Sequence, residues 1–263
     1  MISHPLKSGL LFCNALLLAV AFLGNPSAAQ TVITLGTAEN FAVLGGTSVA
    51  NTGATIISAG DLGVSPGASI TGFPPGTVTG GSVHLNDAVA LQAHNDATTA
   101  YNQLAGLTPT ADLTGQDLGG LTLTPGVYFY SAAAAFTSGV LTLDGLNQAD
   151  TLFVFQIGST LTTTGVTSFN FINGATASNV WFQVGSSATL GVNTSFAGTI
   201  IALASDTLIT GASVEGRVIA LTGTVTLDTN TITNVPEPAA TALIVAALAG
   251  LAVFGLRRRR SAR

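Results

Sequence analysis

Residues 198–231, GTIIALASDTLITGASVEGRVIALTGTVTLDTNT, contain one pattern twice. The apolar run at 200–203 (IIAL) returns as VIAL at 218–221, and TGAS at 210–213 returns at the same interval as DTNT at 228–231. Short apolar strands that repeat about every twenty residues, with Gly and Asn between them, are typical of stacked coils. One coil cannot bury its apolar side alone, so the stretch predicts a β-solenoid.

The same repeat extends toward the N-terminus. Aligning Gln156 with Gln183, Ala202 and Ala220 gives intervals of 27, 19 and 18 residues. These intervals place Thr164 beside Gly191, Thr210 and Asp228, and they place Thr167 beside Thr194, Ser213 and Thr231. The alignment predicts two neighbouring columns rich in hydroxyl residues, the first of which Asp228 interrupts.

A different period predicts one long helix from about residue 83 to 105. Apolar residues recur there at spacings of three and four, which gives one apolar stripe: Leu85, Val89, Ala93, Ala97, Ala100, Tyr101 and Leu104. A helix of this length spans about 30 Å, enough to lie along about six stacked coils. The preceding GFPPG at 72–76 predicts a rigid loop.

The N-terminal 29 residues have the pattern of a secretory signal peptide. Basic or weakly basic residues at His4 and Lys7 precede an apolar run at 10–23, and small residues at 27–29 offer a cleavage site. An uncleaved membrane anchor is the alternative. Cleavage would remove Cys13, the only cysteine, so the exported chain would have no disulfide.

The C-terminal residues 235–263 predict a membrane-associated tail. A VPEP motif at 235–238 is followed by an uncharged apolar run at 239–256, long enough for a transmembrane helix, and by a basic end at 257–263. Arginines next to such a helix favour the cytoplasmic side. Residues 30–234 are therefore expected outside the inner membrane, anchored by 239–256 transiently or permanently and then at the cell surface or extracellular.

The charge of residues 30–234 excludes several functions. This region has one base, Arg217, and eleven acids, and nucleic acids and anionic lipids both require clustered bases. No two acids adjoin in the predicted register, whereas glycosidases and calcium sites need grouped carboxylates. We expect no catalytic site, metal or cofactor, and an ion pair between Arg217 and Glu215.

Several blocks resemble the bacterial and fungal ice-binding protein family: LGTAENFAVL at 35–44, GDLGVSPG at 60–67, HLNDA at 84–88, DLTGQDLGG at 112–120 and TPGVY at 124–128. The resemblance covers residues 35–232. The tail is similar to a PEP-CTERM sorting signal, which implies an exosortase-type processing enzyme; its motif residues are Pro236, Glu237, Pro238, Arg257, Arg258, Arg259 and Arg260.

The resemblance implies a mainly β fold: a discontinuous right-handed β-solenoid of triangular cross-section with one long α-helix alongside. It also implies that a flat face binds ice through Thr-Ala/Gly-x-Thr/Asn segments. Threonine suits that task because its χ1 angle is stiff and it presents a methyl group beside a hydroxyl. The candidate ice-binding residues are Thr52, Thr55, Thr164, Thr167, Thr194, Thr210, Ser213, Thr229 and Thr231.

Two functions are compatible with these patterns. The first is an exported antifreeze or ice-adhesion protein whose partner is the ice surface. The alternative is a non-catalytic structural or adhesive protein of the cell surface and exopolysaccharide matrix, which would use the same scaffold without recognising ice.

Overall fold

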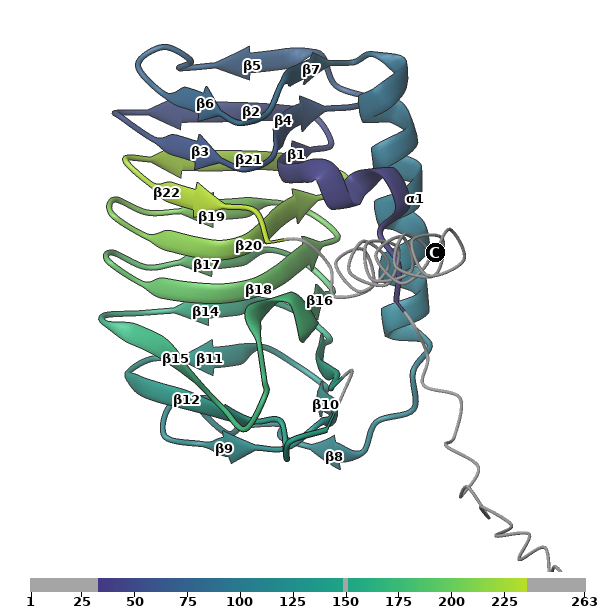
Figure 1. The fold of residues 1–263 in the computed structure, drawn as a ribbon, viewed down its shortest axis with the longest axis vertical. Helices are drawn as coiled ribbons and strands as arrows, with labels where there is room; N and C mark the ends of the chain where they lie inside the picture. The colour runs from purple at the N-terminus through teal and green to yellow at the C-terminus, as the bar shows by residue number, and fades with distance from the viewer. Residues whose placement is uncertain (1–32, 149–150, 236–263) are drawn as a thin grey trace, which may run out of the picture. The chain divides into compact units, whose positions relative to one another are not determined.

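The computed structural model describes residues 33–148 and 151–235. The predicted signal peptide and sorting tail lie outside these residues. The described part is mainly β, with one 18-residue helix, α1 (Ala88–Ala105), beside three sheets built from parallel strand pairs (Figure 1). This confirms the expected class of fold. Within 33–148 and 151–235, no helix is both long and apolar enough to cross a membrane.

A seven-stranded sheet forms one face of the stack, which we call the hydroxyl face. Its strands, in spatial order, are β11 (Ala134–Phe136), β14 (Leu161–Thr163), β17 (Ala188–Leu190), β19 (Asp206–Leu208), β21 (Thr224–Asp228), β2 (Ser48–Thr52) and β5 (Ser69–Thr71). Most of the inward side chains of these strands are apolar, as strand alternation requires for a sheet with one buried side.

A twelve-stranded sheet covers the other two faces. Its main path is β6 (Thr77–Thr79), β3 (Ile56–Ser58), β22 (Thr231–Thr233), β20 (Ser213–Ala220), β18 (Ser195–Ala202), β16 (Val180–Val184), β13 (Phe153–Ile157), β10 (Gly126–Tyr130) and β8 (Ala111–Asp112). A branch of β1 (Phe41–Gly45), β4 (Asp61–Val64) and β7 (Val83–Leu85) leaves it at β20.

Two glycines bend this sheet around a corner. β18 and β20 are each eight residues long, and they turn at Gly198 (φ +112°) and Gly216 (φ +147°). A side chain on Gly216 would collide with the carbonyl oxygen of Gly198 on the neighbouring coil. Glycine is required here because other residues rarely adopt these angles.

The halves of β18 and β20 before the bend lie with β22, β3 and β6 on what we call the third face. That face is completed by a separate three-stranded sheet of β9 (Thr122–Leu123), β12 (Gly139–Asp144) and β15 (Thr167–Ile172). β15 pairs with β12 but belongs to a different sheet from its neighbour β18. The third face is therefore divided.

The coils do not stack in the order of the sequence. β1 pairs with both β4 and β20, and β2 pairs with β21, so the first coils lie directly on the last. Figure 1 shows these N-terminal strands above the C-terminal ones, while α1 carries the chain to the opposite end of the stack at β8. The discontinuity that the family resemblance implied is present.

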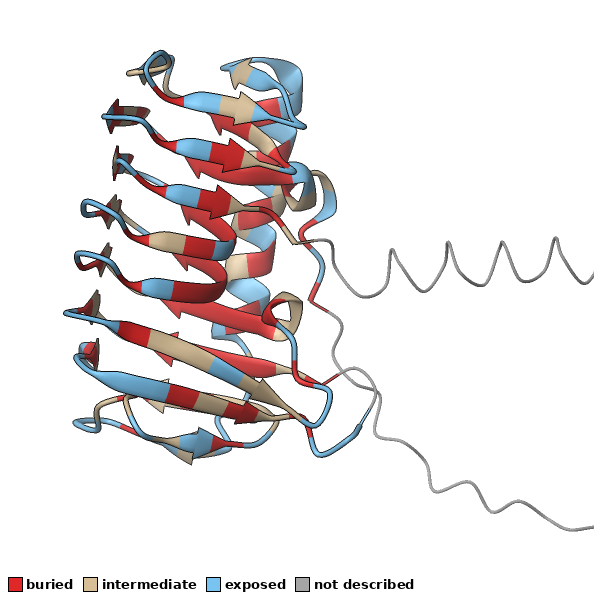
Figure 2. Ribbon diagram, turned by 60° about the vertical axis from the view of Figure 1, so that its left-hand side comes forward, coloured by how far each residue is buried: buried red, intermediate tan, exposed pale blue. Residues whose placement is uncertain are grey.

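Two hydrophobic clusters hold the fold together. Inside the coils, the aromatic rings of Tyr128, Phe155 and Phe182 stack on successive strands, with centroids 5.5 and 4.5 Å apart. Between α1 and the sheet, fully buried helix residues pack in one cluster with apolar residues such as Trp181 and Ile201; the helix residues are Ala90, Ala93, Ala97, Ala100 and Leu104. Small side chains let the helix lie close to the strands. Figure 2 shows this buried interior.

The helix begins later than predicted. Residues 83–85 form β7 against β4, and Asp87 caps the helix by accepting a hydrogen bond from the Ala90 N–H at 2.8 Å. The expected stripe is otherwise correct, except that Ala90 rather than Val89 is buried and Tyr101 is only partly buried. The error arose because pairing with β4 outweighs the helical period of the sequence around Leu85.

One interval of the predicted register was wrong. Gln183 pairs with Gln156 as predicted, but it lies opposite Ile201, not Ala202. A slip of one residue would turn each side chain to the other side of the sheet. Ile201 packs against the helix, whereas Ala202 points into the coil. The interval is 18 residues here, as it is between Ala202 and Ala220.

Candidate functional site

The outer side of the hydroxyl face carries a continuous column of short side chains. In spatial order the column is Ala135, Thr162, Thr189, Thr207, Thr226, Ala50 and Thr71, and each adjacent pair is in direct register. We call its five threonines the threonine ladder. Their side chains are exposed or partly exposed, and none of them makes a side-chain hydrogen bond with other described residues, so their hydroxyls are available to an outside surface.

A second hydroxyl column lies two residues earlier on the same coils. It contains Ser187, Ser205, Thr224, Ser48 and Ser69. Several of these hydroxyls are engaged within the column: Ser48 Oγ lies 2.8 Å from Thr224 Oγ1, and the Thr224 N–H donates to Ser205 Oγ at 3.2 Å. These bonds link neighbouring strands and fix the face.

The two columns form a two-dimensional array. Neighbouring strands are about 4.8 Å apart, and residues two apart on one strand are about 6.7 Å apart. The first column has no charged side chain among the described residues, and the second has none either. The array therefore offers repeated hydroxyl and methyl groups to an extended surface.

The other two faces are less suited to such a surface. On one, α1 contacts β1, β4, β7, β13 and β16 and covers them. On the third face, the boundary between β15 and β18 interrupts the sheet. The hydroxyl face is the one that extends through seven strands within a single sheet.

An acid lies beneath the threonine ladder without adding charge to it. Asp206 points inward between Ala188 and Val225, is fully buried, and neither of its carboxylate oxygens has a hydrogen-bond partner among the described residues. Burial raises the pKa of Asp206 well above its ordinary value, because an unpaired buried carboxylate is strongly disfavoured. The group is therefore a neutral carboxylic acid in the folded protein at neutral pH.

Three of the predicted ice-binding residues are inside the molecule. Thr55, Thr167 and Thr194 are each 0% exposed. They lie at the corner turns that follow the hydroxyl face, where two of them bond buried groups: Thr194 Oγ1 lies 2.7 Å from Thr163 Oγ1, and Thr55 Oγ1 accepts from the Asn230 N–H at 3.0 Å. The prediction that these three side chains meet ice was wrong, because the corner buries them and its polar groups need partners.

Four other predicted residues lie at the edge of the hydroxyl face or beyond it. Thr52 and Thr164 are exposed at its border. Thr210 and Thr229 are exposed in corner turns, where both hydroxyls donate to the Asp228 carboxylate. The hydrogen bond from Thr210 is the main reason why the pKa of Asp228 is lowered.

Ser213 and Thr231 are neighbours, as predicted, but they lie on the third face. Ser195, not Thr194, completes their row. The structure therefore does not bring the nine predicted residues onto one surface.

The sequence did contain a signal for the threonine ladder. A hydroxyl residue, an inward residue and a threonine recur once per coil as triplets: TLT at 160–162, SAT at 187–189, SDT at 205–207, TVT at 224–226 and SIT at 69–71. The Thr-Gly-x-Thr turns are more conspicuous because of their glycines, and they pointed to the corners instead. Strand alternation identifies the triplets.

One histidine contacts two acids outside this face. His84 Nδ1 lies 2.8 Å from Asp87 and Nε2 lies 3.7 Å from Asp61. His94 is half-buried on α1, and burial lowers its pKa. In the described part of the chain, His, Cys, Asp and Glu side chains form no group of three that could hold a metal ion.

These features define a class of protein: a stack of parallel β coils with a helix alongside and a regular hydroxyl-bearing face. The chain belongs to the Ice-binding-like family, whose model matches residues 43–233. An ice-binding protein of Nostoc sp. (strain HG1) is 48% identical over 243 residues, which cover 88% of this chain and 89% of that protein.

Solved structures agree with this assignment. The crystal structure of an ice binding protein from an Antarctic biological consortium aligns with a TM-score of 0.75 at 52% identity, covering 78% of this chain and 92% of that one. The ice-binding protein of the Antarctic ascomycete Antarctomyces psychrotrophicus aligns with a TM-score of 0.73 at 45% identity, covering 77% and 98%.

Proposed function

We propose that this protein binds ice through the hydroxyl face, with the threonine ladder as its centre. The observation that carries the proposal is the uninterrupted column of five threonines and two alanines on seven paired strands. Ice presents a repeating lattice, and a rigid array with stiff side chains loses little entropy when it binds. Membership of the Ice-binding-like family supports the same function.

The surroundings of the ladder favour ice over a charged ligand. Neutral Asp206 lies beneath it, and the carboxylate of Asp228, at its border, is engaged by hydrogen bonds from Thr210 and Thr229. Thr52 and Thr164 extend the array at its edge, and we retain them as ice-contacting residues. Thr210, Thr229, Ser213 and Thr231 remain predictions of weaker contribution.

We further propose the finer features that the chain pattern predicts. The fold is a right-handed, three-sided β-solenoid. Residues 1–29 export the protein, 239–256 hold it at the inner membrane, and an exosortase-type enzyme processes the tail at Pro236, Glu237 and Pro238. The protein then acts at the cell surface or outside the cell, without catalysis or a cofactor. The alternative of a matrix adhesive applies if ice is not bound.

The test is incorporation into ice. Fluorescently labelled full-length protein is presented to an ice crystal growing on a cold probe, and the labelled fraction taken into the ice is measured. Thr207→Lys places a long charged side chain at the centre of the ladder and should reduce incorporation at least about tenfold, because its ammonium ion would have to lose its hydration. Exclusion of the unchanged protein from ice would refute the proposal.

The matched control is Thr231→Lys on the third face. It makes the same chemical change at an exposed threonine of a neighbouring sheet and should leave incorporation near that of the unchanged protein. If Thr231→Lys abolishes incorporation and Thr207→Lys does not, ice binding belongs to the third face.

A further inference from the structure

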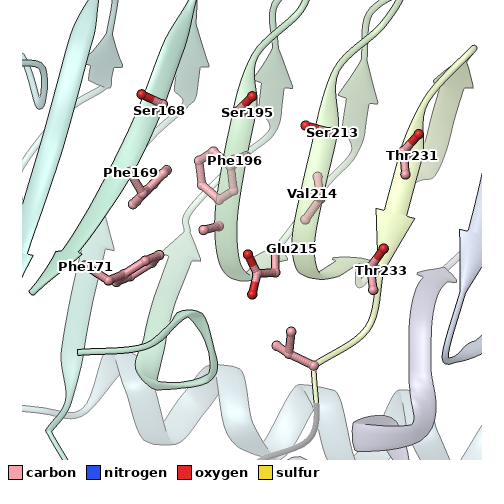
Figure 3. Close-up of a pocket in the computed structure, with 12 residues that line it drawn as sticks. Ser168, Phe169, Phe171, Ser195, Phe196, Ser213, Val214, Glu215, Thr231 and Thr233 are labelled. Atoms are coloured by element: carbon pink, nitrogen blue, oxygen red, sulfur yellow. The ribbon is translucent and has the colours of Figure 1, made fainter. Parts of the chain in front are cut away.

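The boundary that divides the third face opens a groove. It lies between β15 and the first half of β18, and its volume is about 450 Å³, within the range typical of small-molecule sites. Figure 3 shows β15 and β18 diverging from a row of hydroxyl residues toward Phe171 and Glu215. The groove is on a different face from the threonine ladder, so ice binding does not account for it.

The floor of the groove is aromatic. Phe169 and Phe171 follow each other on the inner side of β15, with ring centroids 6.1 Å apart and planes within 15° of parallel. The ring of Phe196, on β18, meets Phe169 edge to face at 5.1 Å. Phe196 is buried, but Phe169 and Phe171 remain partly exposed because no strand of the twelve-stranded sheet pairs with the outer edge of β15.

The rim of the groove is polar and unengaged. Ser168, Ser195, Ser213 and Thr231 form one row across four strands (Figure 3), and Glu215 lies two residues beyond Ser213. Among the described residues, these five side chains make no side-chain hydrogen bond. Three of the strands keep the regular spacing of about 4.8 Å, so the row offers donors and acceptors at repeated intervals.

We propose that this groove binds a neutral saccharide. A pyranose ring has C–H groups on its faces, which pack on aromatic rings, and hydroxyls around its edge, which match the serine row and the Glu215 carboxylate. The exposed carboxylate and the scarcity of bases in residues 30–234 disfavour an anionic sugar. The row of hydroxyls continues along the stack, which fits a chain of sugars rather than a single one.

This inference gives the matrix partner a site, and it holds whether or not ice is bound. Two faces with different ligands would let one molecule attach a polysaccharide layer while its hydroxyl face meets ice.

Affinity electrophoresis of the full-length protein tests the site. Native gels containing dextran, laminarin or hydroxyethyl cellulose should retard the protein, and a gel containing alginate, an anionic polysaccharide, should not. Phe171→Leu keeps the apolar bulk but removes the aromatic face, and it should weaken retardation at least about fivefold. Glu215→Gln should weaken it by about the same factor, because a charged acceptor is replaced by a neutral one.

Two controls separate this site from the ice face. Thr207→Lys should keep saccharide retardation and lose ice incorporation, whereas Phe171→Leu and Glu215→Gln should do the reverse. Equal mobility of the unchanged protein in all gels would overturn the proposal. So would retardation by alginate alone, or retardation that both groove variants leave intact.

Discussion

The hydroxyl of Thr194 lies 2.7 Å from that of Thr163 inside the corner between the hydroxyl face and the third face. Thr163 Oγ1 also accepts from the Gly191 N–H at 2.9 Å. Both threonines are buried, Thr194 at 0% and Thr163 at 1% exposure. The last residue of this corner turn therefore holds the corner together, which is a structural task and not a binding task.

This relationship predicts that Thr194→Val destabilises the fold without affecting ice binding. Removing one hydroxyl leaves Thr163 without its buried hydroxyl partner, which should lower the free energy of unfolding by about 1–3 kcal/mol. Urea denaturation measures the change. Thr162→Val, which removes a hydroxyl from the outer side of the same strand as Thr163, should change stability by less than about 0.5 kcal/mol. Equal losses in both variants would contradict the assignment.

A second prediction concerns the gap in the threonine ladder at Ala50. Its neighbours in the column are Thr226 and Thr71, and Ala50→Thr would extend the run of threonines through β2. Threonine also favours strands, so stability should be unchanged or slightly raised. Incorporation into ice should increase about twofold or more. Ala54→Thr, at an exposed corner position, serves as the control and should have no effect.

A third prediction concerns pH. In the folded protein, the pKa of Asp206 is raised above its ordinary value of 3.8 by burial. The folded state thus retains a proton that the unfolded chain releases, and stability must fall as pH rises from about 4 toward the raised pKa. The slope contributed by this one group is at most about 1.4 kcal/mol per pH unit.

Replacing the acid with Asp206→Val should remove that contribution. The variant should be more stable than the unchanged protein at pH 7, and its advantage should shrink toward pH 3, because Asp206 is protonated in both states there. Thermal unfolding across this pH range checks it. Asp144→Asn, at a partly exposed acid, should leave the pH profile unchanged. If the profile of Asp206→Val runs parallel to that of the unchanged protein, Asp206 is not the source.

A fourth prediction concerns Arg217, which is fully buried. Its guanidinium donates to the carbonyl oxygens of Glu39, at 3.0 and 3.1 Å, and of Val235, at 2.8 Å. It thereby links β20 to the segments at both ends of the described domain. Arg217→Ala should lower the free energy of unfolding by about 3 kcal/mol or more, since these buried acceptors lose their donor.

Arg217→Lys should recover only part of that loss, because an ammonium group cannot reproduce the forked geometry. Glu215→Gln tests the ion pair that the sequence predicted with Arg217. Glu215 is exposed before the Gly216 bend, so we expect a change below about 0.5 kcal/mol. A loss equal to that of Arg217→Ala would instead restore the ion pair as the main interaction.

Much of the fold could be predicted because it depends on local periodicity. The eighteen-residue return of the apolar runs, the stacking of Phe155 on Phe182 and the alanine stripe of α1 all follow from side-chain direction in strands and helices. The start of the helix was wrong because β7 is made by pairing with β4, a strand outside the helical segment, and no local pattern reports such pairing.

The candidate site depended on the tertiary structure. By itself the sequence determined that coils stack, that a helix lies beside them and that hydroxyl residues recur once per coil. It could not determine which recurring hydroxyl faces outward, because a shift of one residue, as at Gln183 and Ile201, exchanges inside for outside. Only the packed structure placed Thr194 inside a corner, Thr207 on an open face, and Phe171 beside a gap that an unpaired strand edge leaves in the third face.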